Sequence, residues 1–284
     1  MPGNPALLQL RKHQIAVLAM LTVHFTIMAL PSMKQADIEY HSTAAGKYDE
    51  EVTRWFHFYH VYSLYPWIRS VTARTSNPVT LDIGTGTGVV ACAMAKRGCS
   101  VTAIDHSPEM LAIAQRNAGS EGAKIKFDCG DVEMLPYDAE SFDAVTIQGV
   151  LHHLADASQV LREAFRVLRP GGGMYISEPC SEGAAISRWV NGLSGVIGGL
   201  RRDQNDKLKV SDHEKPIDGS RLVRDLEAMG FTVKAEYLAR FGVVRFLPES
   251  WRIYPTLLLS LPTRRIRGDL IFISAHKMLA GGPQ

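Results

Sequence analysis

The sequence predicts an α/β protein built on a doubly wound parallel sheet with helices on both faces. From residue 78 onward, short apolar stretches rich in β-branched residues alternate with stretches of helical periodicity. A glycine-rich loop separates the first strand from the first helix, and an acid ends the second strand. The chain has 284 residues, which is enough to bury the core that such a sheet requires.

Residues 79–105 are expected to form the first strand, a loop, a helix and the second strand. The strand, 79–83, is apolar and β-branched. The loop carries glycine at alternate positions, at Gly84, Gly86 and Gly88. Glycine lets backbone N–H groups approach a ligand at the positive end of a helix. The helix is expected to end at Gly98, and the second strand finishes in Asp105, an acid that can accept both hydroxyls of a ribose.

The remaining elements follow from their own start and stop signals. The pair 107–108 marks a helix start, with serine as N-cap and proline in the first turn. The apolar stripe 161–168 predicts another helix, which the proline and glycines of 170–173 stop. Ser220 is expected to cap the last helix, which ends at Gly230. Further strands are predicted at 124–127, 142–147, 174–178, 231–238 and 270–277.

The spacing of the loop glycines indicates the ligand. A dinucleotide fingerprint would place glycine at position 89, which is Val89. Asp82 lies at the end of the first strand, two residues before Gly84. A carboxylate there suits a ligand with an ammonium group and repels a pyrophosphate. A ligand with a ribose and an amine but no phosphate chain is indicated, and S-adenosylmethionine (SAM) fits this description.

With these features the sequence resembles class I SAM-dependent methyltransferases, specifically the small-molecule type 11 branch with its ubiquinone- and menaquinone-biosynthesis-like enzymes. The resemblance covers about residues 78–180, in the family's order and spacing. It is carried by LDIGTGTG, AIDHSPEML, CGDVEMLPYDAESFDAVTIQGVLHHL and LREAFRVLRPGGGMYISEP. The resemblance implies a Rossmann-like, mostly parallel seven-stranded sheet of order 3-2-1-4-5-7-6 with strand seven antiparallel. It also implies SAM as cofactor.

The resemblance places the cofactor along the ends of the strands. Asp131 matches the acid that accepts the adenine amine, and the N–H of Val132 matches the donor to a ring nitrogen; a solvated turn is the alternative for Asp131. Gln148 is expected near the methionine part, and Tyr48 belongs to a segment that often closes over the cofactor. The predicted cofactor-binding residues are Tyr48, Asp82, Gly84, Thr85, Gly86, Gly88, Asp105, His106, Met110, Asp131, Val132 and Gln148.

Two histidines, His152 and His153, follow the fourth strand and are the candidate catalytic residues. Either can act as a general base, because an unperturbed imidazole titrates near neutrality. A structural or pocket-lining role is the alternative, since the LHHL pattern also occurs in the family where no base is needed. The sulfonium already makes the methyl group electrophilic, so the protein mainly has to align a nucleophile and exclude water.

No metal site is predicted. The cysteines form no CxxC pair, so neither a zinc site nor a disulfide framework is indicated. All four are expected to be small core-filling residues, although Cys180 could also face the pocket. They are Cys92, Cys99, Cys129 and Cys180.

Residues 1–34 form a hydrophobic N-terminal segment whose apolar run, 15–30, follows Arg11 and Lys12. The run falls short of the roughly 20 residues that span a bilayer and lacks a signal-peptidase pattern. Three alternatives stay open: a helix packed on the domain or peripheral to a membrane, sequence upstream of a start at Met33, or a true anchor. Since SAM is made in the cytosol, a cytoplasmic protein is predicted, with membrane association as the alternative.

The methyltransferase domain is expected to span 78–280, after a helical N-terminal cap at 35–77. Aromatic residues concentrate in the cap, either to pack on the domain or to form the wall of a pocket for a flat substrate. Insertions are predicted at about 181–216 and 240–267, where substrate caps form in this family. The part 246–267 is apolar and then basic, so it could cover a hydrophobic substrate, touch a membrane surface, or pack in the core.

The sequence therefore predicts methyl transfer from SAM to an oxygen, carbon or nitrogen atom of a small, hydrophobic metabolite that is quinone-, polyketide- or lipid-like. The net charge of +2 and the lack of a basic stripe weigh against a nucleic-acid partner. A nucleic-acid or protein methyltransferase is the alternative within enzymes. A non-catalytic SAM-binding or membrane-associated protein is the alternative outside them. The oligomeric state is left open.

Overall fold

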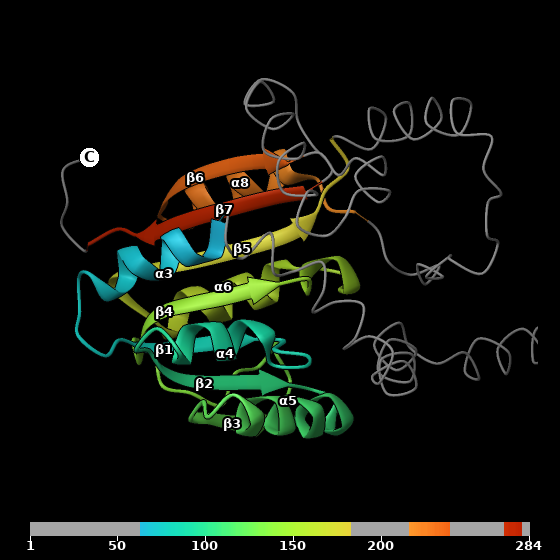
Figure 1. The fold of residues 1–284 in the computed structure, drawn as a ribbon. Helices are drawn as coiled ribbons and strands as arrows, with labels where there is room; N and C mark the ends of the chain where they lie inside the picture. Colours follow the sequence, from blue (N-terminus) through green and yellow to red (C-terminus); the bar gives the residue numbers. More distant parts are fainter. Residues whose placement is uncertain (1–62, 183–215, 239–269, 280–284) are drawn as a thin grey trace, which may run out of the picture.

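The computed structural model describes residues 63–182, 216–238 and 270–279 (Figure 1). Within these ranges, seven strands form one sheet in the order β3-β2-β1-β4-β5-β7-β6, and β7 runs antiparallel to both of its neighbours. The predicted fold and strand order are confirmed. Tyr48, the segment 1–34, residues 35–62 of the helical cap and nearly all of both insertions lie outside the described residues. No helix in the described ranges has the length and apolar character needed to cross a membrane.

The predicted elements lie close to their expected positions. The strands are β1 (Val79–Ile83), β2 (Ser100–Asp105), β3 (Ile125–Cys129), β4 (Phe142–Gln148), β5 (Leu168–Pro179), β6 (Phe231–Leu238) and β7 (Leu270–Lys277). The helices are α3 (Tyr65–Thr72), α4 (Val89–Ala95), α5 (Pro108–Ser120), the short 3₁₀ helix η2 (Leu151–His153), α6 (Ser158–Val167) and α8 (Gly219–Ala228).

Helices cover both faces of the sheet, with α3 and α4 on one face and α6 and α8 on the other (Figure 1). Successive residues of a strand point to opposite faces. On β4, Val145 and Ile147 join the core under α6 and α8, whereas Ala144 joins the core under α3 and α4. The central strand β4 is therefore buried along nearly its whole length, as expected for a parallel strand that is covered on both faces.

The cap of α5 is confirmed, but the predicted cap of α8 is wrong. Ser107 Oγ accepts a hydrogen bond from Met110 N at 3.2 Å, and proline occupies the first turn of α5. At α8 the N-cap is Asp218, whose carboxylate accepts from Arg221 N at 2.8 Å. Asp218 has the extended backbone that an N-cap needs, and its negative charge also favours the helix start. Ser220 lies one position inside the helix instead.

The boundary between α6 and β5 differs from the prediction. Leu168 was expected in the helical stripe, but its backbone is extended and it begins β5. Pro170 disfavours a helical conformation at Arg169, the residue before it, so α6 has to end ahead of this point. The glycines after Pro170 lie within β5 and not between the helix and the strand, and a register shift between Phe142 and Ala144 on β4 accommodates them.

Three of the four cysteines are buried as expected. Cys180 belongs to the core cluster under α6 and α8 and does not line the pocket described below. Cys129 is exposed, so the prediction for it is wrong. It is the last residue of β3, which lies at the edge of the sheet.

Candidate functional site

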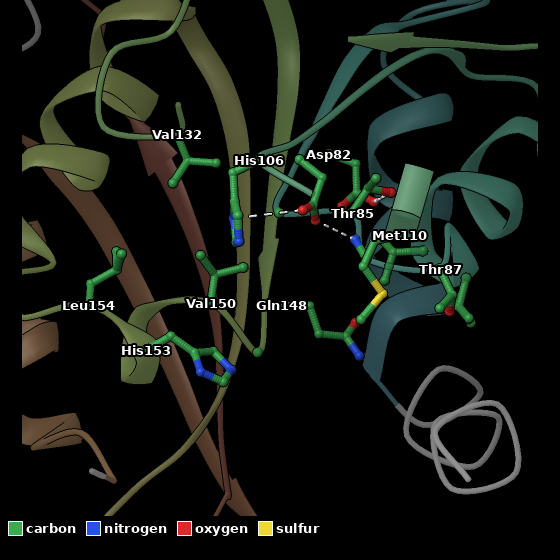
Figure 2. A pocket seen from close by; sticks show the side chains of 16 residues that line it. Asp82, Thr85, Thr87, His106, Met110, Val132, Gln148, Val150, His153 and Leu154 are labelled. Atoms are coloured by element: carbon green, nitrogen blue, oxygen red, sulfur yellow. Dashed lines mark hydrogen bonds and ion pairs between the residues drawn. The ribbon is translucent and has the colours of Figure 1, made fainter. Parts of the chain in front are cut away.

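A cavity of about 110 Å³ lies at the carboxyl ends of β1, β2 and β4 (Figure 2). In doubly wound sheets, ligands bind at this edge, where neighbouring strands lead into loops and helices that diverge. We call this cavity the pocket. It is lined by Asp82, Gly84, Thr85, Gly86, Thr87, Val89, Val90, Asp105, His106, Met110, Val132, Gln148, Gly149, Val150, His153 and Leu154.

Each glycine of the loop after β1 has its own structural reason. A Cβ on Gly84 would lie 2.4 Å from Cγ2 of Val150, so only glycine fits there. A Cβ on Gly88 would lie 2.9 Å from Cβ of Ala114, so this glycine allows α4 and α5 to pack closely. Gly88 does not line the pocket. Gly86 has φ of +52° with open space around it, and it faces the pocket.

Asp105 ties the glycine loop to the end of β2. One carboxylate oxygen accepts from Gly86 N at 2.8 Å and the other accepts from Ser107 N at 2.9 Å. The residue is buried and lines the pocket. Since a carboxylate has about four lone-pair positions, Asp105 retains acceptor capacity for the hydroxyls of a ligand.

Asp82 is a second buried acid in the same pocket. Its carboxylate accepts from Thr146 Oγ1 at 2.6 Å and from Thr85 Oγ1 at 2.7 Å. Burial raises the pKa of Asp82 to about 6; the two hydroxyl hydrogen bonds act against the rise, and the charge of Asp105 adds to it. Two buried carboxylates around one cavity favour a ligand that carries positive charge.

The segment after β4 forms the opposite wall. Figure 2 shows His153 and Leu154 across the pocket from Met110 and Thr87. Of the two candidate histidines, only His153 lines the pocket. The other, His152, has its Nδ1 2.8 Å from Oε2 of Glu178, and its ring lies 4.0 Å from the ring of His153 between centroids.

Most of the described residues predicted to bind the cofactor lie in the pocket lining, but two do not. These two residues are Gly88 and Asp131. Oδ1 of Asp131 accepts from Glu133 N at 3.0 Å and so stabilises the turn after β3. The neighbouring residue, Val132, does line the pocket. The lining also includes residues that the sequence analysis did not select, namely Thr87, Val89, Val90, Gly149, Val150 and Leu154. Most are apolar and carry no chemical signal; their one clue was position, directly after the glycine loop or after β4.

His106 offers a polar group toward a ligand. Its Nδ1 lies 3.7 Å from Oδ1 of Asp105, and its Nε2 is buried with no hydrogen-bond partner among the described residues. This nitrogen is therefore available to bond a ligand atom in the pocket. No group of three or more histidine, cysteine or acidic side chains with metal-site geometry occurs in the described part of the chain.

Comparisons with known proteins point to a methyltransferase domain. A family model described as "Methyltransferase domain" matches residues 81–176. A demethylmenaquinone methyltransferase from Thermus thermophilus is 41% identical over 178 residues, which cover 57% of this chain and 78% of that protein. A ubiquinone biosynthesis O-methyltransferase from Coxiella burnetii is 33% identical over 97 residues, covering 34% of this chain and 42% of that protein. The fold is similar to that of the YcgJ protein from Bacillus subtilis, with a TM-score of 0.53 and 21% identity over 78% of this chain and all of that one.

The fold and the pocket together define a Rossmann-like protein with two buried acids beside a glycine loop. The chain belongs to the class I SAM-dependent methyltransferases, as its similarity to the Thermus protein shows. SAM is the cofactor that membership of this family implies. The pocket fits it, since Asp105 can accept from a ribose and Asp82 suits a cation. The chain spans 42% of the length of the Coxiella relatives.

Proposed function

We propose that this protein transfers a methyl group from SAM to a small, hydrophobic metabolite. The observation that carries the proposal is the pair of buried acids, Asp82 and Asp105, which belong to one pocket beside a glycine loop. Two buried carboxylates so arranged favour a cation, and SAM bears both a sulfonium and an ammonium group. Family membership supports the same donor.

The lining residues support an orientation for SAM. Asp105 accepts from the ribose hydroxyls, and Asp82 lies toward the ammonium end. The N–H of Val132 and the Nε2 of His106 bond the adenosine part, against which Met110 packs. Gln148 contacts the methionine part. Asp131, Gly88 and Tyr48 keep the roles that the family resemblance implies for them, with Asp131 bonding the adenine amine.

The wall after β4 supports a hydrophobic acceptor. Gly149, Val150 and Leu154 offer an apolar surface, and His153 adds one titratable group. A quinone-like ring is the first acceptor to test, because the Thermus and Coxiella relatives are named for menaquinone and ubiquinone biosynthesis. Polyketide- and lipid-like molecules are the next candidates.

The reaction is a direct displacement at the methyl carbon. The acceptor atom forms a bond to the methyl group as the S–CH₃ bond breaks, and the sulfonium becomes a neutral thioether. For a hydroxyl or an acidic carbon, His153 takes up the proton of the acceptor as general base. His152 does not line the pocket, and its proposed role is support of His153. Alignment and exclusion of water supply the remaining rate enhancement.

Mass spectrometry of metabolite extracts incubated with the protein and methyl-labelled SAM tests the proposal. We expect label in a small apolar product, and less of it with Asp105→Ala at a SAM concentration that does not saturate the variant. Label in RNA or in protein would establish the alternative enzyme class. Retained SAM binding with no labelled product in any extract would favour a non-catalytic SAM-binding protein.

We also infer a cytoplasmic site of action, because SAM is made in the cytosol. A peripheral membrane contact through 15–30 or 246–267 rests on the sequence pattern alone. Flotation of the full-length protein with anionic lipid vesicles tests the contact. Co-flotation that persists in variants lacking both segments would contradict it.

A further inference from the structure

Glu178, next to the last residue of β5, is a fully buried acid that does not line the pocket. One carboxylate oxygen, Oε1, accepts from two backbone groups, Val150 N at 2.8 Å and Leu151 N at 2.9 Å. The other oxygen, Oε2, lies 2.8 Å from Nδ1 of His152. A single side chain therefore contacts three consecutive residues of the wall that carries His153.

These contacts determine the form of the neighbouring histidine. A buried carboxylate is tolerated when donors surround it, and an ionised carboxylate can only accept. When Glu178 is ionised, Oε2 can only accept, so the bond at Oε2 is donated by Nδ1 of His152. A carboxylate on one ring nitrogen fixes both the tautomer and the ring plane of a histidine.

The histidine that Glu178 holds is stacked on the one that lines the pocket. The ring centroids of His152 and His153 are 4.0 Å apart, and the rings are inclined by 39°. A second anchor lies beside this pair, since Gly149 N donates to Ser177 O at 2.9 Å. The backbone on both sides of Val150 is thus attached to the end of β5.

We propose that Glu178 is a positioning residue for methyl transfer: it holds His152 in its Nδ1–H form, and through the ring stack it sets the orientation of His153 in the pocket. The kinetic part of this inference rests on the proposed function. The assignment of the tautomer does not depend on it.

Glu178→Gln separates positioning of the histidine from anchoring of the backbone. The amide oxygen of glutamine can still accept from Val150 N and Leu151 N. Its NH₂ group then faces Nδ1 of His152, which has to become an acceptor and carry its proton on Nε2. The variant keeps the loop attached and reverses the tautomer.

Nitrogen NMR of histidine-labelled protein reads the tautomer directly, without any substrate. We expect the Nδ1–H form of His152 in the wild type and the Nε2–H form in Glu178→Gln. In parallel, kcat should fall by about tenfold or more, while the SAM dissociation constant changes by less than about twofold. Asp143→Asn is the matched control, because Asp143 also accepts a backbone bond, from Val79 N at 2.8 Å, at the start of β4 and away from the pocket. It should leave the His152 signals unchanged.

A double-mutant cycle checks that the effect passes through His152. His152→Phe keeps a ring against His153 but removes the partner of Oε2, so combining it with Glu178→Gln should cost no further loss of kcat. Independent, multiplying losses would overturn the proposal.

An Nε2–H form of His152 in the wild type would also overturn the proposal, and this result needs no variant to fold. Unchanged kcat in a folded Glu178→Gln protein would do the same. If the wild type methylates nothing, the proposed function fails on its own, and the NMR result still decides the tautomer.

Discussion

Asp82 should make the stability of this protein fall as the pH rises from the acidic to the neutral range. Its folded-state pKa is raised from 3.8 to about 6, so the folded state holds a proton that the unfolded chain releases. The stabilisation from this proton is fully present below pH 3.8 and is lost as the pH rises through about 6. The difference of roughly 2 pKa units corresponds to about 3 kcal/mol across the whole range.

Asp82→Asn removes this dependence, because the amide does not titrate. Between pH 4.5 and 7.5, linkage predicts that the wild type loses about 2 kcal/mol of unfolding free energy relative to the variant. Urea unfolding at a series of pH values measures the difference. Any change in unfolding free energy caused by the asparagine side chain itself is the same at each pH, so it does not affect the comparison of the two pH profiles. Parallel pH profiles of the two proteins would refute the reasoning.

Two threonine variants locate the effect at Asp82. Thr146→Val removes a hydroxyl that donates to Asp82 and holds its pKa down, so the loss of stability should extend to higher pH. Thr80→Val is the matched control, since Thr80 is equally buried and its hydroxyl donates to Ser100 O at 3.4 Å without a contact to Asp82. Thr80→Val should leave the pH range over which stability is lost unchanged.

The other predictions concern ligand binding, turnover and packing. Asp105→Ala should weaken SAM binding by about 1–3 kcal/mol in calorimetry, through loss of charge-assisted hydrogen bonds, and unchanged affinity would remove the ribose assignment. His153→Ala should lower kcat by about 10²–10⁴-fold with SAM affinity unchanged, if the acceptor loses a proton; full turnover would leave alignment and water exclusion as the source of catalysis. Gly84→Ala should lower the melting temperature because its methyl meets Val150. Val150→Ala should restore part of that loss, and a double variant no more stable than Gly84→Ala would contradict the steric explanation.

The features that the sequence predicted well are those that depend on local chemistry. The serine–proline start of α5 acts within a few residues. The glycines after β1 and the acid at the end of β2 contact more distant residues, but their types and spacing form a pattern that can be read from the chain. The prediction of Ser220 as helix cap was wrong because serine and aspartate both cap helices, and Asp218 lies only two positions earlier.

The features that the sequence did not predict depend on contacts between distant segments. Of the adjacent histidines in the short 3₁₀ helix, only His153 lines the pocket, and no periodicity distinguishes it from His152. Glu178 carried no signal, because its partners lie 26 to 28 residues earlier on a neighbouring strand end. The apolar pocket residues resemble ordinary core residues until the sheet brings the loops after β1 and β4 together.

The contact between Gly84 and Val150 has a consequence for engineering. The isopropyl group of Val150 occupies the space that a side chain on Gly84 would need, so the loop proposed to hold the donor and the wall proposed to hold the acceptor share one interface. Grafting the 149–154 segment of a relative to change acceptor preference would alter the shape presented to the glycine loop. A redesign of substrate choice therefore has to keep a Val150-sized side chain at this point, or treat the two loops as a single unit of exchange.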